Sequence, residues 1–254
     1  AYHVLPYPHH VMHSRSQSLL PIYHFMEFIF VRHGEPAWSI DGISQVDPGL
    51  TARGHGQSRL AAEFLSDPER PVTEILVSPA RRAIETAAPL IAATGLEPTV
   101  VEDLVEIRMP DWSTTPEDEV QAQFREAQQR HPKDWWAGMP GGESFDDFHK
   151  RIAAAMTEVA KQRGAVALEG NDRHLWRFDG DPDQRIAVVA HAGTNSAALG
   201  TLLHIDPTPW EWDRFALGHA SVSRARLIAL GGQHVFSLRA LNDRVHLPRE
   251  LRSR

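Results

Sequence analysis

Short apolar runs alternate along this chain with longer segments in which apolar positions recur at helical spacing. The short runs have the length of buried strands and span residues 27–33, 73–77, 98–101 and 186–190. The longer segments predict helices over 52–65, 79–93, 144–163 and 194–203. Strands that alternate with helices form a mostly parallel sheet covered on both faces. The pattern therefore predicts an α/β fold, a three-layer sandwich with a mostly parallel central sheet.

Capping residues mark where several of these helices begin. Thr51 and Ser144 are placed to cap helices with their hydroxyl groups, and Ser78 followed by Pro79 is expected to open another. Near the end of the chain, a glycine pair is expected to form the turn of a β-hairpin between residues 222–230 and 234–240.

Three segments depart from the pattern. Residues 1–25 are expected to be a flexible extension, and their histidines are too irregularly spaced, without acidic partners, to favour a metal site. Residues 165–185 are polar and acidic and predict a surface insertion, with a hairpin around Gly170 or Gly180. Residues 243–254 are charged and are expected to form a loose tail. No repeat or linker divides residues 26–242, which predict one domain.

Composition limits the classes of function. The chain has 254 residues and a formal charge of −7, so it lacks the general basic surface that attracts nucleic acid. It has no cysteine, which excludes disulfides, thiolate catalysis and zinc–thiolate sites and fits a cytoplasmic location. No run of 18 apolar residues predicts a membrane span. An anion site would have to be local, built from a few converging cations.

Three predicted strand ends carry residues suited to phosphoryl chemistry. The first strand ends at Arg32-His33, where Gly34 allows close approach of a ligand. A reactive imidazole beside a permanent cation is suited to attack on phosphorus. Ser78, with two arginines after it, follows a second strand. His191 ends a third, and the small residues after it leave backbone N–H groups open at a helix start. Because ligands bind at the carboxyl ends of parallel strands, these residues are expected to meet.

Two further assignments stay open on the residues alone. Arg81 and Arg82 follow the strand at 73–77, but they project about 100° apart on a helix, so both are not expected in one pocket. A carboxyl group could protonate a leaving alcohol, yet the pattern barely separates Glu106 from Glu102 or Asp103.

The chain resembles the histidine phosphatase superfamily, in its phosphoglycerate-mutase-like branch. Six ordered motifs between about residues 27 and 230 carry the resemblance: Val31-Arg32-His33-Gly34-Glu35; Leu50-Thr51 with Gly54 and Gln57; Ser78-Pro79-Ala80-Arg81-Arg82-Ala83 with Thr86; Leu104-Val105-Glu106-Ile107; Gly141-Gly142-Glu143-Ser144; and Val188-Val189-Ala190-His191-Ala192-Gly193-Thr194.

The resemblance implies a role for each matched residue. His33 would be the nucleophile and Glu106 the general acid and base, while Arg32 and Arg82 would bind phosphate and His191 would complete the catalytic pocket. Substrate contacts are expected from the remaining positions near the motifs: Glu35, Ser39, Ala192 and Gly193. Ser39 stands where family members commonly carry Asn. The family uses no metal and no cofactor, and it inserts a helical lid, here about 108–140.

The expected function is a phosphatase that hydrolyses a small phosphomonoester, with a small phosphorylated metabolite as partner and neither nucleic acid nor membrane. The alternatives are a phosphoglycerate mutase using the same intermediate and a phospho-ligand-binding protein with little turnover. The lid tryptophans Trp112, Trp135 and Trp136 could stack on a substrate or pack against one another. The polar helix at 116–131 is a candidate for lid movement or for contact in a homodimer.

Overall fold

An eight-stranded sheet forms the centre of the computed structural model, which describes residues 26–253. The extension predicted for 1–25 lies outside the described residues. The strands are ordered β5 (Thr99–Val100), β4 (Glu74–Val77), β8 (Arg185–Ala190), β1 (Glu27–Arg32), β9 (Val222–Leu230), β10 (Gln233–Asp243), β7 (Trp176–Phe178) and β6 (Ala165–Ala167). Neighbours from β5 to β1 are parallel, and the pairings from β1 to β6 are antiparallel.

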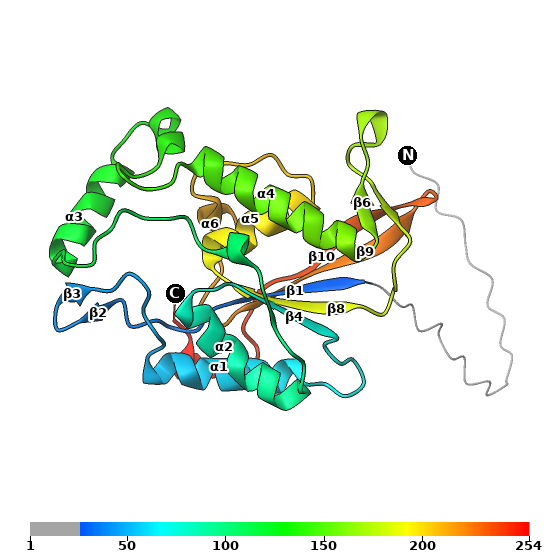
Figure 1. Ribbon diagram of the computed structural model, residues 1–254, viewed down its shortest axis with the longest axis horizontal. Coiled ribbons are helices and arrows are strands. Elements are labelled where there is room, and N and C mark those ends of the chain that lie inside the picture. The colour runs from blue at the N-terminus through cyan, green and yellow to red at the C-terminus, as the bar shows by residue number, and fades with distance from the viewer. Residues whose placement is uncertain (1–25, 254) are drawn as a thin grey trace, which may run out of the picture.

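Helices cover both faces of this sheet (Figure 1). The helices α1 (Ala52–Leu65) and α2 (Arg81–Thr94) lie on one face, and α4 (Phe145–Gln162) and α5 (Ala192–Leu202) lie on the other. Strand β1 is apolar at successive positions because its side chains point alternately into two hydrophobic cores. Phe28 and Phe30 belong to one core, and Ile29 and Val31 belong to the other. The predicted α/β sandwich is confirmed.

The parallel register aligns the ends of three strands. Arg32 of β1 pairs with Ala190 of β8, and Val77 of β4 pairs with Val189 of the same strand. The residues that follow these ends therefore emerge side by side at one edge of the sheet.

Two predicted helix caps are present, and one is wrong. The Thr51 hydroxyl accepts a hydrogen bond from the Gly54 N–H at 3.0 Å, and Ser144 caps α4 in the same way. Ser78 does not open α2, which begins at Arg81 after Ala80. Its hydroxyl lies 2.8 Å from Nε2 of His191 instead. The serine that was expected to cap a helix therefore contacts the residue at the end of the neighbouring strand.

The segment predicted as a lid contains α3 (Glu117–Gln128) and the 3₁₀ helix η2 (Pro132–Ala137). Helix α3 stands beyond the end of the sheet, beside the small hairpin of β2 (Ser39–Ile40) and β3 (Ile43–Ser44) (Figure 1). A bridge between Ile43 and Pro116 joins the hairpin to the start of α3. The described contacts thus place this segment over the end of the sheet, and its motion stays a prediction.

The polar segment at 165–185 forms the predicted hairpin, with the 3₁₀ helix η3 (Gly170–Asp172) at its turn. Strand β7 also pairs with β10 through Trp176 and His234, so the hairpin extends the main sheet. Trp176 is fully buried and anchors it. The short elements η1 (Glu102–Leu104), α6 (Glu211–Arg214) and η4 (Arg249–Leu251) complete the chain.

The expectation of a loose C-terminal tail is wrong. Leu247 is buried and packs with Ala61 of α1. Nε2 of Gln57 donates hydrogen bonds to the Leu251 carbonyl at 2.6 Å and to the Ser253 hydroxyl at 2.9 Å. The sequence of the tail is mostly charged, but its one buried apolar residue, Leu247, anchors it. The polar contacts to Leu251 and Ser253 come from Gln57, which lies 194 and 196 positions away.

Glu27, at the start of β1, provides a prediction about stability. Its carboxylate is fully buried and ion-paired with Arg226 at 2.9 Å, Arg185 at 3.1 Å and Arg70 at 3.3 Å. Burial alone raises the pKa of Glu27, but hydrogen bonds from Arg226 and Arg185 outweigh it, so the pKa is lowered. We expect Glu27→Gln to reduce the free energy of unfolding at pH 7 by about 3 kcal/mol.

The sign with pH follows from the lowered pKa. The carboxylate stabilises the fold fully above its unfolded pKa of about 4.5, and this contribution is lost as pH falls through the lower folded value. The deficit of Glu27→Gln in urea denaturation should therefore shrink in acid. The exposed Glu63→Gln is the matched control, with an expected effect below about 0.5 kcal/mol. Equal effects of the two substitutions would contradict the prediction.

Candidate active site

Five of the residues predicted to act together form one cluster at the aligned strand ends. The rings of His33 and His191 lie with their centroids 5.3 Å apart. The charges of Arg32 and Arg82 act on both histidines, and Glu106 interacts electrostatically with both arginines. Residues separated by up to 159 positions in sequence (32 to 191) are thus brought to one place.

The His33 ring is held in one tautomer. Its Nδ1 lies 2.8 Å from the Gly34 carbonyl oxygen, which can only accept a hydrogen bond, so Nδ1 carries the proton and Nε2 keeps its lone pair. Burial, and then the charges of His191, Arg32 and Arg82, lower the pKa of His33 well below 6.5. A neutral imidazole with a free ring nitrogen is the form that can act as a nucleophile.

The cluster around this histidine contains buried nitrogens that have no hydrogen-bond partner among the described residues. Arg32 donates from Nη1 to the Leu217 carbonyl at 2.5 Å, and its Nη2 lies 3.1 Å from Nε2 of His219. Within residues 26–253, three buried nitrogens of the cluster have no hydrogen-bond partner: Nε of Arg32, Nε of Arg82 and Nδ1 of His191. Buried polar groups are normally satisfied, so this set indicates a site for an anion that supplies acceptors.

Arg82, and not Arg81, belongs to the cluster. Its guanidinium carbon lies 4.9 Å from the centre of the Trp38 ring, and Nη1 lies 3.5 Å from the Asp47 carboxylate. Arg81 is more exposed and pairs with Glu85 at 2.7 Å, the i,i+4 partner that the sequence offers. One helical step thus separates an arginine that lines the cluster from one at the surface.

Glu106 is held by the start of α5. Its Oε2 accepts from the Gly193 N–H at 2.9 Å, and its Oε1 accepts from the Ile107 N–H at 3.1 Å. Burial raises the pKa of Glu106 and outweighs these bonds and the charges of Arg82 and Arg32, which lower it. A raised pKa favours a carboxylic acid that can give up a proton.

This arrangement corrects the expected substrate contact of Gly193. Its N–H, which the sequence left open for a ligand, is taken by Glu106. A methyl group on Gly193 would come within 2.5 Å of Glu106 Oε1 and 2.8 Å of the Trp212 ring. Glycine is therefore required here for close packing against the carboxylate.

The other expected substrate contacts are placed less directly. Ala192 begins α5 and lines a cleft together with Arg32. The Glu35 carboxylate accepts from the Thr51 hydroxyl and from Arg53, both at 3.0 Å. Ser39 pairs with Ser44 in the β2–β3 hairpin, and none of the contacts described for the cluster involves it.

Sequence reasoning missed His219. Its ring centroid lies 5.6 Å from that of His33, and its Nε2 contacts Arg32. It lies in the loop between α6 and β9, with no charged or apolar periodicity around it that could have marked it.

A cleft of about 770 Å³ opens from Arg32 and Ala192, a volume that holds a small organic ligand. Its lining includes three polar residues, Arg244, Arg252 and Ser253. It also includes four aromatic residues, here called the aromatic wall: Phe124, Trp135, Trp210 and Trp212. Trp135 and Trp210 pack edge to face with centroids 5.6 Å apart, so a lid tryptophan both packs and faces the cleft.

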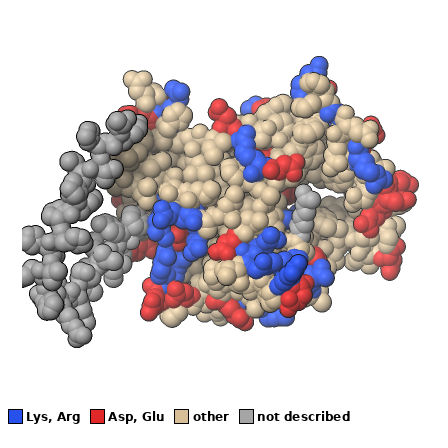
Figure 2. All heavy atoms as spheres, turned by 180° about the vertical axis from the view of Figure 1, so that it is seen from behind, with Lys and Arg blue, Asp and Glu red and all other residues tan. Residues whose placement is uncertain are grey.

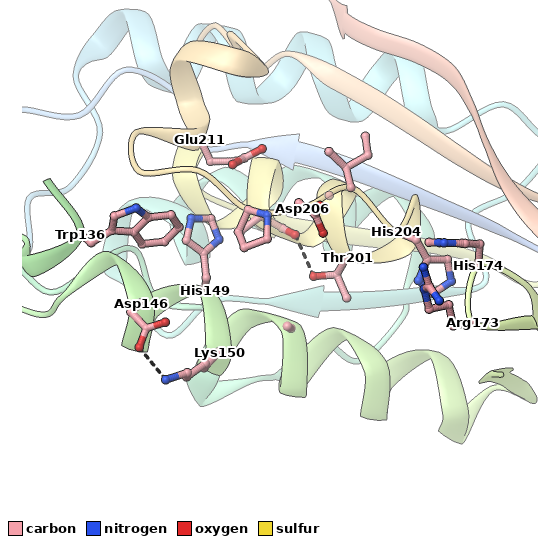
Figure 3. Close-up of a pocket in the computed structure, with 15 residues that line it drawn as sticks. Trp136, Asp146, His149, Lys150, Arg173, His174, Thr201, His204, Asp206 and Glu211 are labelled. Carbon is pink, nitrogen blue, oxygen red and sulfur yellow. Dashed lines mark hydrogen bonds and ion pairs between the residues drawn. The ribbon is translucent and has the colours of Figure 1, made fainter. Parts of the chain in front are cut away.

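A second pocket, of about 530 Å³, lies between α4 and α5 (Figure 3). Lys150 there pairs with Asp146 at 2.5 Å, and Nε2 of His149 lies 2.9 Å from the Thr208 carbonyl. These groups already have partners, and no lining residue belongs to the histidine cluster. The pocket is therefore not the candidate active site.

The surface charge is consistent with a local anion site. Figure 2 shows basic and acidic side chains interspersed on the face that it presents. None of the helices within residues 26–253 combines the length and the apolar character that a membrane span requires.

Comparison with known proteins gives the cluster a context. Residues 28–168 match the model of the histidine phosphatase superfamily, branch 1. The phosphoserine phosphatase 1 of Hydrogenobacter thermophilus is 30% identical over 206 residues, which cover 78% of this chain and 85% of that protein. The glucosyl-3-phosphoglycerate phosphatase of Mycobacterium tuberculosis is 29% identical over 72% of this chain and 77% of its own length.

Solved structures agree with these relatives. A mycobacterial glucosyl-3-phosphoglycerate phosphatase in complex with VO3 superimposes with a TM-score of 0.65 at 26% identity, covering 85% of this chain and 99% of that one.

Proposed function

The chain belongs to the histidine phosphatase superfamily and is a phosphatase of that superfamily; from this premise we propose that it hydrolyses a small phosphomonoester through a phosphohistidine on His33. One observation carries the proposal: a neutral imidazole with a free Nε2 lies among three buried nitrogens that lack hydrogen-bond partners in the described part of the chain. A phosphoryl group supplies both the electrophile and the missing acceptors.

In the first step, Nε2 of His33 attacks phosphorus as the bond to the leaving oxygen breaks. Arg32, Arg82 and His191 donate hydrogen bonds to the phosphoryl oxygens and stabilise the charge that spreads over them. Glu106 in its protonated form, which burial favours by raising its pKa, transfers its proton to the leaving oxygen. The products are an alcohol, phospho-His33 and the Glu106 carboxylate.

In the second step, water attacks the phosphoryl group on His33. The Glu106 carboxylate takes a proton from this water, and the phosphorus–nitrogen bond breaks. Inorganic phosphate leaves, and His33 returns to the neutral tautomer that Gly34 holds. The arginines serve both steps, because they bind the anion and, together with the larger effect of burial, lower the pKa of His33.

A panel of phosphomonoesters tests this function by measuring released phosphate. It should include O-phosphoserine and glucosyl-3-phosphoglycerate, the substrates in the names of the relatives, and 3-phosphoglycerate. Phosphate release is the expected result. Conversion of 3-phosphoglycerate into its 2-isomer without phosphate release would indicate a mutase. Binding of these esters without turnover or labelling of His33 would indicate a phospho-ligand-binding protein.

The cleft suggests which esters are preferred. Trp212 packs against Gly193, which holds Glu106, so the body of the leaving group would lie along the aromatic wall. Elsewhere in the lining of the cleft, a methyl group on Gly218 would come within 2.8 Å of Arg244 Nη1, and the preceding residue, Leu217, accepts from Arg32. Arg244 is therefore close to the phosphate-binding arginine and suited to a second anionic group on the same substrate.

We expect Arg244→Gln to lower kcat/KM for O-phosphoserine about 10-fold, because a carboxylate loses a cationic partner worth about 1.4 kcal/mol. Phosphoethanolamine, which lacks the carboxylate, should be hydrolysed at an unchanged rate. The exposed Arg249→Gln is the matched control on the same C-terminal segment. Equal losses for the two substrates would assign Arg244 a different role.

A further inference from the structure

We propose that His219 and Ser253 are positioning residues that hold Arg32 in the orientation in which it binds phosphate. The inference rests on the proposed role of Arg32 in that binding. The observation behind it is a continuous chain of hydrogen bonds, which runs from the Arg32 guanidinium through the buried His219 ring to the Ser253 hydroxyl near the C-terminus.

The directions of these bonds follow from chemistry. Arg32 Nη2 can only donate, so Nε2 of His219, 3.1 Å away, must accept. The neutral ring then carries its proton on Nδ1, which donates to the Ser253 hydroxyl at 2.9 Å. Burial and the charge of Arg32 lower the pKa of His219 to about 3, which keeps the ring neutral near pH 7.

Ser253 is itself held at three points. Its hydroxyl accepts from Gln57 Nε2 at 2.9 Å as well as from His219, and its own proton goes to the Glu35 carboxylate, which can only accept. Gln57 in turn accepts from the Glu35 N–H at 2.8 Å. Because its proton is directed to Glu35, the Ser253 hydroxyl can only accept a hydrogen bond from His219.

The accepting Ser253 hydroxyl determines the tautomer of His219. Without the Ser253 hydroxyl, the proton on Nδ1 loses its acceptor, and the alternative tautomer with a proton on Nε2 becomes accessible. That proton would point at the donors of Arg32, which would then keep only the Leu217 carbonyl. If Arg32 loses the hydrogen bond to His219, its guanidinium can adopt other orientations, and phosphate binding weakens.

The loop that carries His219 is also fastened to the nucleophile. The Ala220 N–H donates to the His33 carbonyl at 3.2 Å, and the His219 N–H donates to the Ser253 carbonyl at 3.3 Å. Segments from β1, the loop before β9 and the C-terminal tail thus meet at Arg32.

Substitutions of His219 and Ser253 separate positioning from packing. His219→Gln places an amide oxygen near the position of Nε2 and should keep the acceptor for Arg32. His219→Asn reaches only the position of Nδ1 and should lose it. We expect His219→Asn and Ser253→Ala each to raise KM, and the inhibition constant of inorganic phosphate, about 10-fold with a smaller change in kcat. His219→Gln and the tail control Arg249→Ala should stay within about twofold of the wild type.

A ¹⁵N NMR spectrum of the histidine rings gives a readout that does not depend on turnover. The wild type should show His219 protonated on Nδ1, and Ser253→Ala should shift the population toward Nε2. If the Nδ1 tautomer is seen but neither variant changes KM or phosphate inhibition, positioning is rejected while the phosphatase function stands. If His219→Gln fails as badly as His219→Asn while both remain folded, the acceptor role is rejected. Absence of turnover in the wild type on every ester would reject the proposed function instead, and phosphate binding and the NMR tautomer would still test the positioning.

Discussion

His33→Ala is expected to reduce phosphate release by at least about 10⁴-fold, because no other group can form the covalent intermediate in its place. The fold should survive, since the ring lies at a strand end beyond the two hydrophobic cores. Phosphate labelling gives the direct measurement: after rapid quench of the wild type with a ³²P-labelled ester, acid-labile, base-stable label should appear on the peptide that contains His33.

His191→Ala is the matched comparison, because it removes a neighbouring imidazole without removing the nucleophile. It should slow turnover and still permit labelling, whereas His33→Ala should show none. Hydrolysis by folded His33→Ala at a rate close to that of the wild type would reject the assignment of the nucleophile.

Glu106→Gln is expected to lower kcat on esters of poor leaving groups by about 10² to 10⁴-fold. The glutamine keeps the shape and can still accept from the Gly193 N–H, but it has no proton to transfer. p-Nitrophenyl phosphate, whose leaving oxygen needs little protonation, should lose much less at the labelling step. The exposed Glu97→Gln serves as the control for charge. Equal losses on both kinds of ester would move the general acid elsewhere, with Asp111 or Asp103 as the next candidates.

The pH dependence follows from the same pair of groups. His33 reacts when neutral, and its pKa lies well below 6.5, so the nucleophile stays active into moderate acid. Glu106 acts when protonated, and its pKa is raised above 4.5. Activity should therefore fall as the pH rises through this raised pKa. Measured on an ester with a poor leaving group, the pH–rate profile of kcat should be bell-shaped or shifted to acid. A flat profile from pH 4 to 9, with chemistry limiting, would contradict the pairing.

Much of the fold could be predicted because the signals for most helices and strands lie in residues that are close together in sequence. The apolar strand at Phe28–Val31 and the cap at Thr51 depend on neighbours in sequence, and both are found where the pattern placed them. Ser78 and the C-terminal tail were misjudged for the opposite reason. The partner of Ser78 is His191 and that of Leu251 is Gln57, and such distant pairings leave no periodic trace in a single sequence.

The candidate site divides in the same way. Arg32, His33 and His191 could be found because strand ends meet at one edge of a parallel sheet. Arg82 and Glu106 could be chosen over their neighbours only through the resemblance to a known family. His219 belonged to no motif that was recognised, and its importance follows from the geometry around Arg32 alone.

The two hydrophobic cores that share β1 bear on how such a protein can diversify. The nucleophile follows a strand whose side chains pack into a core on each face of the sheet. Substitutions in β1 would therefore disturb stability and reactivity together. Of the residues that line the cleft, Phe124, Trp135 and Arg244 belong to neither core, and Trp210 and Trp212 are only partly buried against one of them. Preference for one leaving group over another could therefore drift among descendants of the gene while the reacting centre stays as it is.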